Sequence, residues 1–437
     1  MQLNFVHFGV YSSHFKWLLI SSLIWVCASA CNRRDIDTAS PNIQIANPTA
    51  GAIFYFENSI EIEATITDDR KLESVQLDVT DAQNNRYLQS QSFFPSQSSF
   101  KLNYSLTHND LYLTSGTYYV RITASDGENE QIAFREIQLI EAPRQQERVF
   151  IIRENGTGTL IDTLHDNTLA TCLDYAAGYL FGGIDSRSNQ LVACGQSPAS
   201  LLSNTFPDFQ NANTPFPLTT ELISAFHHDK ANRCFYWGTN SGSIWRTNIN
   251  GTQQIATFGN AAITAIGSSP THIVAFCEGS SGNYIHALRN DNGVIETSLL
   301  LDWDVVGIIH LNSENDRLLL IGNQAGAAHF TWLNLSTSAI NEVFNFYESS
   351  PVISVCDAAG NNFYAVHEAG IGHYVNGLNS YTMSNTVTAE KLVYDDLENT
   401  LWAVTADGAI RLDESAQTIL QSIPVPGIQD VWIKYNK

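Results

Sequence analysis

The chain has 437 residues, with 22 basic and 44 acidic side chains and a formal net charge of −22. This length exceeds that of one ordinary domain and predicts two. The strong negative charge argues against nucleic acid as a partner, because phosphate binding needs a positive surface, and against docking on anionic lipid through the protein surface. Aromatic residues make up 11% and charged residues 15%, which is typical of a chain rich in strand formers.

The first 30 residues form a candidate export leader. Their one charged side chain is Lys16, which an apolar stretch over residues 17–30 follows. A basic residue, an apolar core and a small-residue exit (Ala-Ser-Ala at 28–30) are typical of a signal peptide. The stretch is shorter than the roughly 20 apolar residues that a transmembrane helix needs. We therefore predict that residues 1–30 are a signal peptide.

Cys31 follows that exit directly. Apolar residues, then small residues, then a cysteine resemble the start of a bacterial lipoprotein, although Ala28 stands where this motif usually has leucine. The resemblance implies that Cys31 becomes the new N-terminus and carries several acyl chains, palmitate among them, which hold the protein firmly on a membrane. Removal of the leader deletes one lysine and no acid, so the mature charge becomes −23. Plain secretion through ordinary signal peptidase and an uncleaved anchor are the alternatives.

Residues 31–40 are polar and predict a tether. Residues 60–66 and 75–79 alternate apolar and polar side chains, as half-buried strands do. A turn at Gly116 leads into a further alternating run, which ends at the Asp126-Gly127 turn. Short strands of this kind over about 100 residues predict an immunoglobulin-like β-sandwich over residues 41–141. The segment resembles the PKD-like and bacterial Ig-like modules of secreted proteins.

A repeat of about 40 residues fills the rest of the chain, after a short predicted linker at residues 142–147. Each copy has an apolar strand, a polar turn, a second apolar strand and a turn with glycine. These turn glycines are Gly242, Gly282, Gly326, Gly370 and Gly408, at spacings of 40, 44, 44 and 38 residues. We expect positive φ there, because a tight hairpin requires it. An earlier copy is expected to have its second strand at 179–184, with Ser188 in place of the glycine.

Four strands in about 40 residues are typical of a β-propeller blade. Residues 428–434 repeat the first-strand pattern, and residues 148–164 supply two strands with no first strand before them. We predict that both ends join in one closing blade, which removes the exposed sheet edges. The predicted fold is therefore all-β, with a propeller over residues 148–437, seven blades being favoured over six or eight. This segment resembles the WD40/YVTN-like propeller superfamily.

Cysteines and histidines indicate neither a disulfide framework nor a metal site. Five cysteines remain after Cys27 and Cys31 are set aside; each lies in an apolar run and none forms a C-x-x-C pair, so we expect buried thiols. His367 and His373 are six residues apart around two glycines, unlike the helical pair of a zinc protease. Acidic loops such as residues 67–69 are expected to be solvated rather than to bind calcium. We expect no metal and no cofactor.

Three residues of the propeller are candidates for ligand binding. His227 and His228 end a first strand, which can place one imidazole near the mouth of the central channel, although a solvated turn is the favoured interpretation. Trp303 lies just before another first strand and is expected to be an exposed ring on which a sugar can pack. The other tryptophans of this segment fall within strand patterns and are expected to pack in or between blades. We identify no catalytic residue.

Together these features predict a lipid-anchored protein of the cell envelope, at the outer membrane, on its periplasmic or surface face. The order of lipid cysteine, Ig-like module and propeller resembles lipoproteins of the Bacteroidota. The sequence favours a non-catalytic platform that binds a protein or a glycan, because the predicted first strands hold few ionisable residues. The alternatives are a propeller enzyme that acts on carbohydrate, as a lyase or glycosidase, and a structural subunit of an envelope complex.

Overall fold

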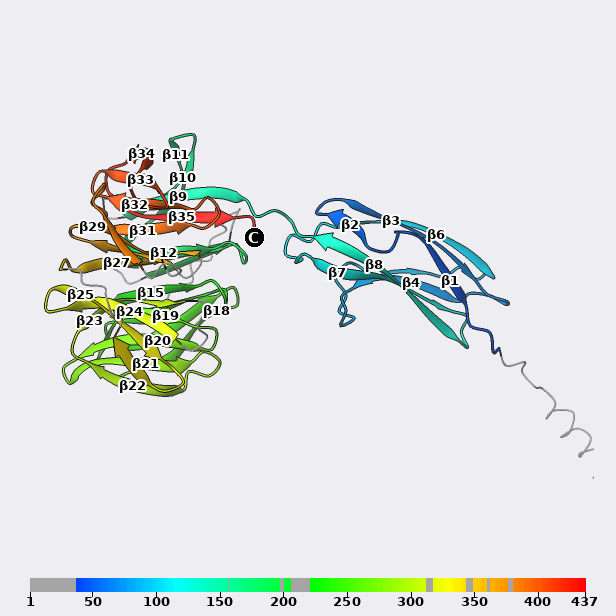
Figure 1. The fold of residues 1–437 in the computed structure, drawn as a ribbon, viewed down its shortest axis with the longest axis horizontal. Helices are drawn as coiled ribbons and strands as arrows, with labels where there is room; N and C mark the ends of the chain where they lie inside the picture. The colour runs from blue at the N-terminus through cyan, green and yellow to red at the C-terminus, as the bar shows by residue number, and fades with distance from the viewer. Residues whose placement is uncertain are drawn as a thin grey trace, which may run out of the picture. The chain divides into compact units, whose positions relative to one another are not determined.

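The computed structural model describes residues 37–156, 158–196, 200–205, 221–311, 317–342, 349–359, 362–375 and 380–437. These residues are all-β, as predicted, and belong to two compact units that divide after Pro143 (Figure 1). No helix long and apolar enough to span a membrane occurs in the described parts of the chain. The predicted leader and Cys31 lie outside the described residues.

The first unit is a sandwich of two sheets. Its strands are β1 (Asn42–Asn47), β2 (Ala52–Tyr55), β3 (Ser59–Thr67), β4 (Ser74–Thr80), β5 (Gln91–Phe93), β6 (Ser99–Thr107), β7 (Gly116–Ser125) and β8 (Glu130–Ile140). One sheet has the order β1-β3-β6, and the other has the order β2-β8-β7-β4-β5. Alternate side chains of β3 are buried, as its sequence pattern predicted. Ile60 and Ile62 of β3 share one core with Val120 and Ile122 of β7.

The second unit contains seven sheets among the described residues. Its strands are β9 (Gln146–Asn155), β10 (Gly158–His165), β11 (Thr168–Tyr175), β12 (Gly178–Asp185), β13 (Gln190–Gln196), β14 (Ser200–Thr205), β15 (Ile223–Asp229), β16 (Cys234–Thr239), β17 (Ser243–Asn248), β18 (Gly251–Thr257), β19 (Ala262–Ser268), β20 (His272–Gly279), β21 (Gly282–Arg289), β22 (Ile295–Leu301), β23 (Asp304–His310), β24 (Arg317–Gln324), β25 (Ala327–Asn334), β26 (Ala339–Glu342), β27 (Val352–Asp357), β28 (Phe363–His367), β29 (Gly370–Val375), β30 (Ser380–Ser384), β31 (Lys391–Asp395), β32 (Thr400–Thr405), β33 (Gly408–Asp413), β34 (Ile419–Pro424) and β35 (Ile428–Tyr435). Six sheets are antiparallel meanders in chain order, and their first strands are β12, β15, β19, β23, β27 and β31.

The remaining sheet joins both ends of the second unit, in the order β11-β10-β9-β35. β35 pairs antiparallel with β9, so that Trp432 lies opposite Phe150 and Ile433 opposite Val149 (Figure 1). The inner strands β35, β12, β15, β19, β23, β27 and β31 contact one another in that cyclic order. The ring therefore closes through both ends of the segment, as the sequence predicted, and β9 is paired on both sides, with β10 and β35.

The turn glycines of the repeat have the conformation that the sequence analysis expected. All five have positive φ, from 82° at Gly326 to 150° at Gly408. At Gly370 a side chain is also excluded by space, because an added Cβ would lie 2.2 Å from the carbonyl oxygen of Ser384. The recurring glycine therefore serves the hairpin itself.

The prediction for the earliest copy of the repeat was wrong by one strand, because residues 179–184 form the first strand of their sheet and not the second. Residues 179–184 belong to β12, which is the inner, first strand of its sheet and pairs with β13. The turn that follows β12 is held by Asp185, whose carboxylate accepts a hydrogen bond of 2.8 Å from the backbone N–H of Ser188. Ser188 therefore lies in the turn between first and second strands. In addition, β9 begins at Gln146, inside the segment predicted as a linker.

Five cysteines lie in the described residues, and all are free. Cys194, Cys234, Cys277 and Cys356 are buried, and Cys172 is half-buried. Burial raises the pKa of the Cys172 and Cys234 thiols to about 11. They behave as the small hydrophobic residues that the sequence predicted.

Candidate functional site

The inner strands run in the same direction, so their last residues lie at the same end of the ring. Their last residues include Asp185, Asp229, Asp357 and Asp395, so the expectation of few ionisable residues in the first strands was wrong. Asp185, Asp229 and Asp395 are buried, and each accepts hydrogen bonds of 2.8–3.2 Å from backbone N–H groups of the turn that follows it. These buried carboxylates therefore hold hairpin turns.

His227 lies near this end of the ring, two residues before the end of β15. Its Nε2 atom is 2.8 Å from Oγ of Ser268, which ends the inner strand of the next sheet. Burial lowers the pKa of His227 to about 4, against the opposing effect of the carboxylates of Asp229 and Asp357. The imidazole is therefore neutral near pH 7 and joins two adjacent sheets by a hydrogen bond.

His228 lies toward the preceding sheet. Its ring stacks on Phe235 at a centroid distance of 4.5 Å, and its Nε2 atom is 3.6 Å from Oδ1 of Asp185. Burial lowers the pKa of His228, although Asp185 opposes that effect. The two predicted histidines thus diverge, one toward Ser268 and one toward Asp185, and do not converge on one point.

Two cations accompany the acidic residues at this end. The carboxylate of Asp357 raises the pKa of Lys230, and Asp396 adds to that effect. Arg144 donates from Nη1 to Oδ2 of Asp396 at 2.8 Å, and its guanidinium lies 3.9 Å from the centroid of the Tyr435 ring. We call His227, His228, Lys230, Asp185 and Asp357 the axial cluster. Lys230 offsets part of its negative charge, which suits structural support of the ring ends.

Trp303 is buried, so the prediction of an exposed ring was wrong. It is 5% exposed and belongs to a core cluster with Val305 and Leu320. The ring of His329 meets it edge-on at a centroid distance of 4.7 Å. The segment between β22 and β23 has to cross from one sheet to the next, and the ring fills the space between them. Trp303 takes no part in a surface site with His227 and His228.

One acidic cluster occurs in the first unit. Carboxylate oxygens of Asp37, Asp68 and Asp69 lie within 4.8 Å of one another. Oδ2 of Asp37 already faces Nε of Arg70 at 3.2 Å. The Arg70 guanidinium is thus the cation at this cluster, and no second feature of the described residues points to a metal there.

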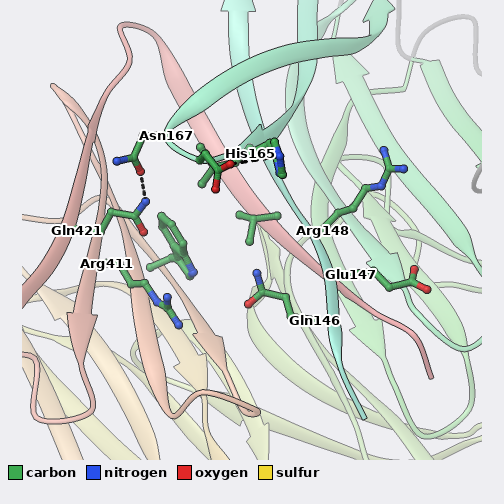
Figure 2. A pocket seen from close by; sticks show the side chains of 11 residues that line it. Gln146, Glu147, Arg148, His165, Asn167, Arg411 and Gln421 are labelled. Carbon is green, nitrogen blue, oxygen red and sulfur yellow. Dashed lines mark hydrogen bonds and ion pairs between the residues drawn. The ribbon is translucent and has the colours of Figure 1, made fainter. Parts of the chain in front are cut away.

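A groove of about 550 Å³ lies between the sheet β31–β34 and the closing sheet. We call it the junction groove. It is lined by Gln146, Glu147, Arg148, Val149, Leu164, His165, Asp166, Asn167, Trp402, Arg411 and Gln421. Its volume falls within the range of about 300–1,000 Å³ typical of small-ligand sites. Figure 2 shows Arg411 and Gln421 on one side, His165 and Asn167 at the rim, and Gln146 opposite.

Three strands place the polar groups on one side of the junction groove. Trp402 of β32 lies opposite Arg411 of β33, which lies opposite Gln421 of β34. The Arg411 guanidinium is 5.8 Å from the centroid of the Trp402 ring, a cation–π contact. Arg411 also donates from Nε to Oγ1 of Thr400 at 2.9 Å. These contacts turn the guanidinium toward its own sheet and leave the groove open.

The opposite side comes from the closing sheet. Gln421 donates from Nε2 to Oδ1 of Asn167, in the turn between β10 and β11. Glu147 accepts a hydrogen bond from the buried ammonium of Lys434. Glu147 and Arg148 extend away from Arg411 and Gln421 in Figure 2, whereas Gln146 lies nearer to them. The inward polar groups are therefore mainly amides and one guanidinium.

A second groove occupies the equivalent position two sheets after the closing sheet. It is lined by Asn232, Cys234, Tyr236, Arg246, Asn248, Asn290 and Asp291, and its volume is about 250 Å³. Tyr236 lies opposite Arg246, which lies opposite Gln253, so the aromatic–arginine–glutamine row of the junction groove recurs. Here Arg246 donates from Nη1 to the carbonyl oxygen of Asn290 in the next sheet at 3.3 Å. The same row thus borders a smaller groove at this position than at the junction.

Sequence reasoning missed the junction groove. Trp402 was correctly predicted to pack in the propeller, since it is 2% exposed, but it was not linked to any site. The signal was present in the repeat, because an aromatic residue, an arginine and a glutamine recur at matching positions of two copies. Residues from the two ends of the segment come into contact only when the ring has closed. A periodic pattern within one copy of the repeat cannot predict that contact.

Comparisons with known proteins agree with the two units. Residues 41–122 match the bacterial Ig domain family. A quinonprotein alcohol dehydrogenase-like protein from Bacteroides thetaiotaomicron aligns at 10% identity and a TM-score of 0.47, over 91% of this chain and 99% of that chain. A protein from Lactobacillus plantarum aligns at 14% identity and a TM-score of 0.51, over 67% of this chain and 99% of that chain.

The β-propeller domain of Cps50 (Swd1) from Myceliophteria thermophila aligns at 11% identity and a TM-score of 0.44, over 60% of this chain and 96% of that chain. No curated protein matches the chain. Likeness at this level of identity concerns the fold and not the activity. The chain thus contains a bacterial Ig domain at residues 41–122, followed by a unit with the fold of a β-propeller.

Proposed function

We propose that this protein is a lipid-anchored component of the cell envelope whose propeller is a non-catalytic binding platform for a protein or glycan. The junction groove is the observation that carries the proposal. It is large enough for a ligand, it is open, and its inward groups are amides and a guanidinium. Such groups bind by hydrogen bonds, each worth about 0.5–1.5 kcal/mol net, and more when one partner is charged.

The lining of the groove suits binding better than chemistry. Its eleven residues include no serine, threonine, cysteine or lysine to act as a nucleophile. A glycosidase needs a carboxyl group that stays protonated, which burial favours. The two carboxylates of the groove, Glu147 and Asp166, are both exposed, and Glu147 is engaged by Lys434. The groove is therefore assigned to recognition.

The proposed membrane anchor is the lipid attached to Cys31. The sequence before it supports cleavage and lipidation, and several acyl chains hold a protein on a membrane stably where a single chain does not. The proposed location is the outer membrane, on its periplasmic or surface face. The membrane is contacted through lipid, and the acidic chain is not expected to bind nucleic acid.

The axial cluster supports a second candidate, an enzyme that acts on carbohydrate. The buried carboxylate of Asp185 and two histidines of depressed pKa are found there, and perturbed groups of this kind gather at active sites. Their contacts favour the structural role, since Asp185 holds a turn and His227 bonds to Ser268. We therefore rank the binding platform first.

Two experiments test the proposal. Membrane fractionation and metabolic labelling with palmitate should place the wild-type protein in the membrane with acyl label, and Cys31→Ala in the soluble fraction without label. Label on the Cys31→Ala protein would overturn the anchor. For the platform, the chain from residue 32 onward is screened against protein and glycan partners. Release of new reducing ends from a bound glycan would favour the enzyme instead.

A further inference from the structure

The junction groove holds two hydrogen-bond donors that the chain itself leaves unused. Trp402 is 2% exposed, yet its Nε1 atom has no hydrogen-bond partner among the described residues. Buried N–H groups in folded proteins are nearly always bonded, so each exception needs an explanation. Because Trp402 lines the groove, an acceptor that enters from outside supplies one.

Arg411 is the second donor. Its Nε donates to Thr400, and its Nη2 lies 3.8 Å from Oδ2 of Asp395. Oδ1 of Asp395 accepts a hydrogen bond of 2.8 Å from the hydroxyl of Tyr435, and Oδ2 has no hydrogen-bond partner among the described residues. A guanidinium carries five N–H groups, so these contacts leave Nη1 of Arg411 without a partner in the described part of the chain. The guanidinium is positioned by its own sheet and keeps capacity for a ligand.

The equivalent groove differs from the junction groove in the placement of its arginine. Arg246 has the same position as Arg411 relative to its aromatic and glutamine neighbours. It reaches across to the carbonyl of Asn290 and leaves about 250 Å³, whereas Arg411 turns back to Thr400 and leaves about 550 Å³. The chain therefore occupies more of the space beside Arg246 than beside Arg411, and the junction groove leaves more room for another molecule.

The groups of the groove select the chemistry of that molecule. Both unused donors require an oxygen acceptor, and a guanidinium prefers a carboxylate. The amides of Gln146, Asn167 and Gln421 offer further donors and acceptors, which suit hydroxyl groups. The Trp402 ring is covered, so a sugar has no exposed indole face here on which to stack. Apolar lining is limited to Val149 and Leu164 beside the buried ring, which gives little to the side chains of a peptide.

We propose that the junction groove binds an acidic saccharide, with the carboxylate on Arg411 and Nε1 of Trp402 and the hydroxyl groups on the amides. This proposal rests on the proposed function and names the ligand class of the same site. The ligand is either a free sugar acid or a uronate residue within a glycan chain, because both present the same carboxylate and hydroxyl groups.

The test is isothermal titration calorimetry on the chain from residue 32 onward. The probes are galacturonic acid, trigalacturonic acid and its methyl ester, which differ in chain length and in the presence of the charge. We expect the trimer acid to bind at least tenfold more tightly than its methyl ester, and more weakly at 500 mM than at 50 mM salt. A monomer that binds as well as the trimer assigns the groove to a free sugar acid.

Four variants locate the binding. Arg411→Gln should weaken binding of the acid at least tenfold, and Trp402→Phe, which removes the N–H and keeps a ring, about threefold to tenfold. Arg246→Gln is the matched control in the closed groove and should leave binding unchanged. Thermal unfolding of each variant checks that it is folded. Arg411→Lys keeps the positive charge and should bind the acid more tightly than Arg411→Gln, which separates loss of charge from loss of structure.

Two results would overturn the proposal without touching the binding platform. One is tight binding of the methyl ester with an unchanged affinity in Arg411→Gln, which would indicate a neutral glycan. The other is binding of a protein partner that is lost in Arg411→Gln while no saccharide binds. Failure of every glycan and protein partner to bind, by contrast, would remove the proposed function itself.

Discussion

Trp402 and Arg411 lie directly opposite each other on adjacent antiparallel strands, with the guanidinium carbon 5.8 Å from the centroid of the indole ring. The ring is buried under the guanidinium, so the pair forms part of the wall of the junction groove and part of the packing between two sheets. Stability and recognition therefore meet at one pair of residues, and variants have to be chosen to separate the two.

Truncation of Trp402 should destabilise the propeller far more than removal of its N–H. Replacement of a fully buried aromatic residue by alanine leaves a cavity and costs about 3–5 kcal/mol. Trp402→Phe keeps most of the apolar contact and should cost about 1–2 kcal/mol. Chemical denaturation followed by fluorescence or circular dichroism measures both values. Equal costs for the two variants would contradict the burial of the ring.

The turn glycines should differ in their tolerance of a side chain. Gly370→Ala combines positive φ with a Cβ placed 2.2 Å from a carbonyl oxygen, and should lower the free energy of unfolding by about 2–4 kcal/mol. Gly326→Ala is the matched control, because its φ is also positive but nothing lies within 4 Å of the added Cβ. It should cost about 1 kcal/mol. Thermal unfolding of both proteins compares them, and an equal loss would show that strain in φ alone sets the cost.

Loss of the last inner strand should open the ring. A chain that stops after Gly427 lacks β35 and leaves β9 and the buried face around Phe150 uncovered. We expect it to aggregate or to unfold without a sharp transition, since an unpaired edge invites association. A chain that lacks only Lys437 is the control and should behave as the wild type. Size-exclusion chromatography decides between them, and a monomeric, cooperatively folded truncation would contradict closure through β35.

His227 should make stability depend on pH below neutrality. Burial lowers the pKa of this imidazole to about 4 in the folded protein, whereas an unfolded histidine titrates near 6.5. As the pH falls below 6.5 the unfolded chain binds a proton that the folded chain does not, so the free energy of unfolding decreases until about pH 4 and then levels off. At about 1.4 kcal/mol for each pH unit, the effect over roughly 2.5 units is at most about 3.5 kcal/mol.

His227→Gln removes this titration and retains an amide that can face Ser268. Its free energy of unfolding should therefore fall less between pH 7 and pH 4.5 than that of the wild type, and the two should run parallel above pH 7. Urea unfolding at a series of pH values makes the comparison. Identical slopes in the two proteins would show that the imidazole is not held neutral.

Much of the architecture is readable from local patterns, because each pattern reports a local requirement. Strict alternation at residues 60–66 predicted a strand with one buried face, and β3 has it. The turn glycines reported positive φ, which side chains rarely allow. The pairing of β35 with β9 followed from incomplete copies at the two ends of the repeat.

The errors arose where the burial of a residue, or the position of its strand in a sheet, depends on a neighbouring sheet. Residues 179–184 looked like a second strand because their apolar pattern is the same, and only the neighbouring sheet marks β12 as an inner strand. Trp303 was expected to be exposed because it lies in a connection, but the adjacent sheet supplies His329 and a core to cover it. The junction groove likewise depends on the contact between two sheets.

The pairing of β35 with β9 has a consequence for how the protein is made. The two partners of the Lys434–Glu147 contact are 287 residues apart in the chain. Contacts of such separation form late, because a long loop has to close before they contribute. The second unit therefore stays open until β35 pairs with β9, so closure of the ring is a late step of its folding.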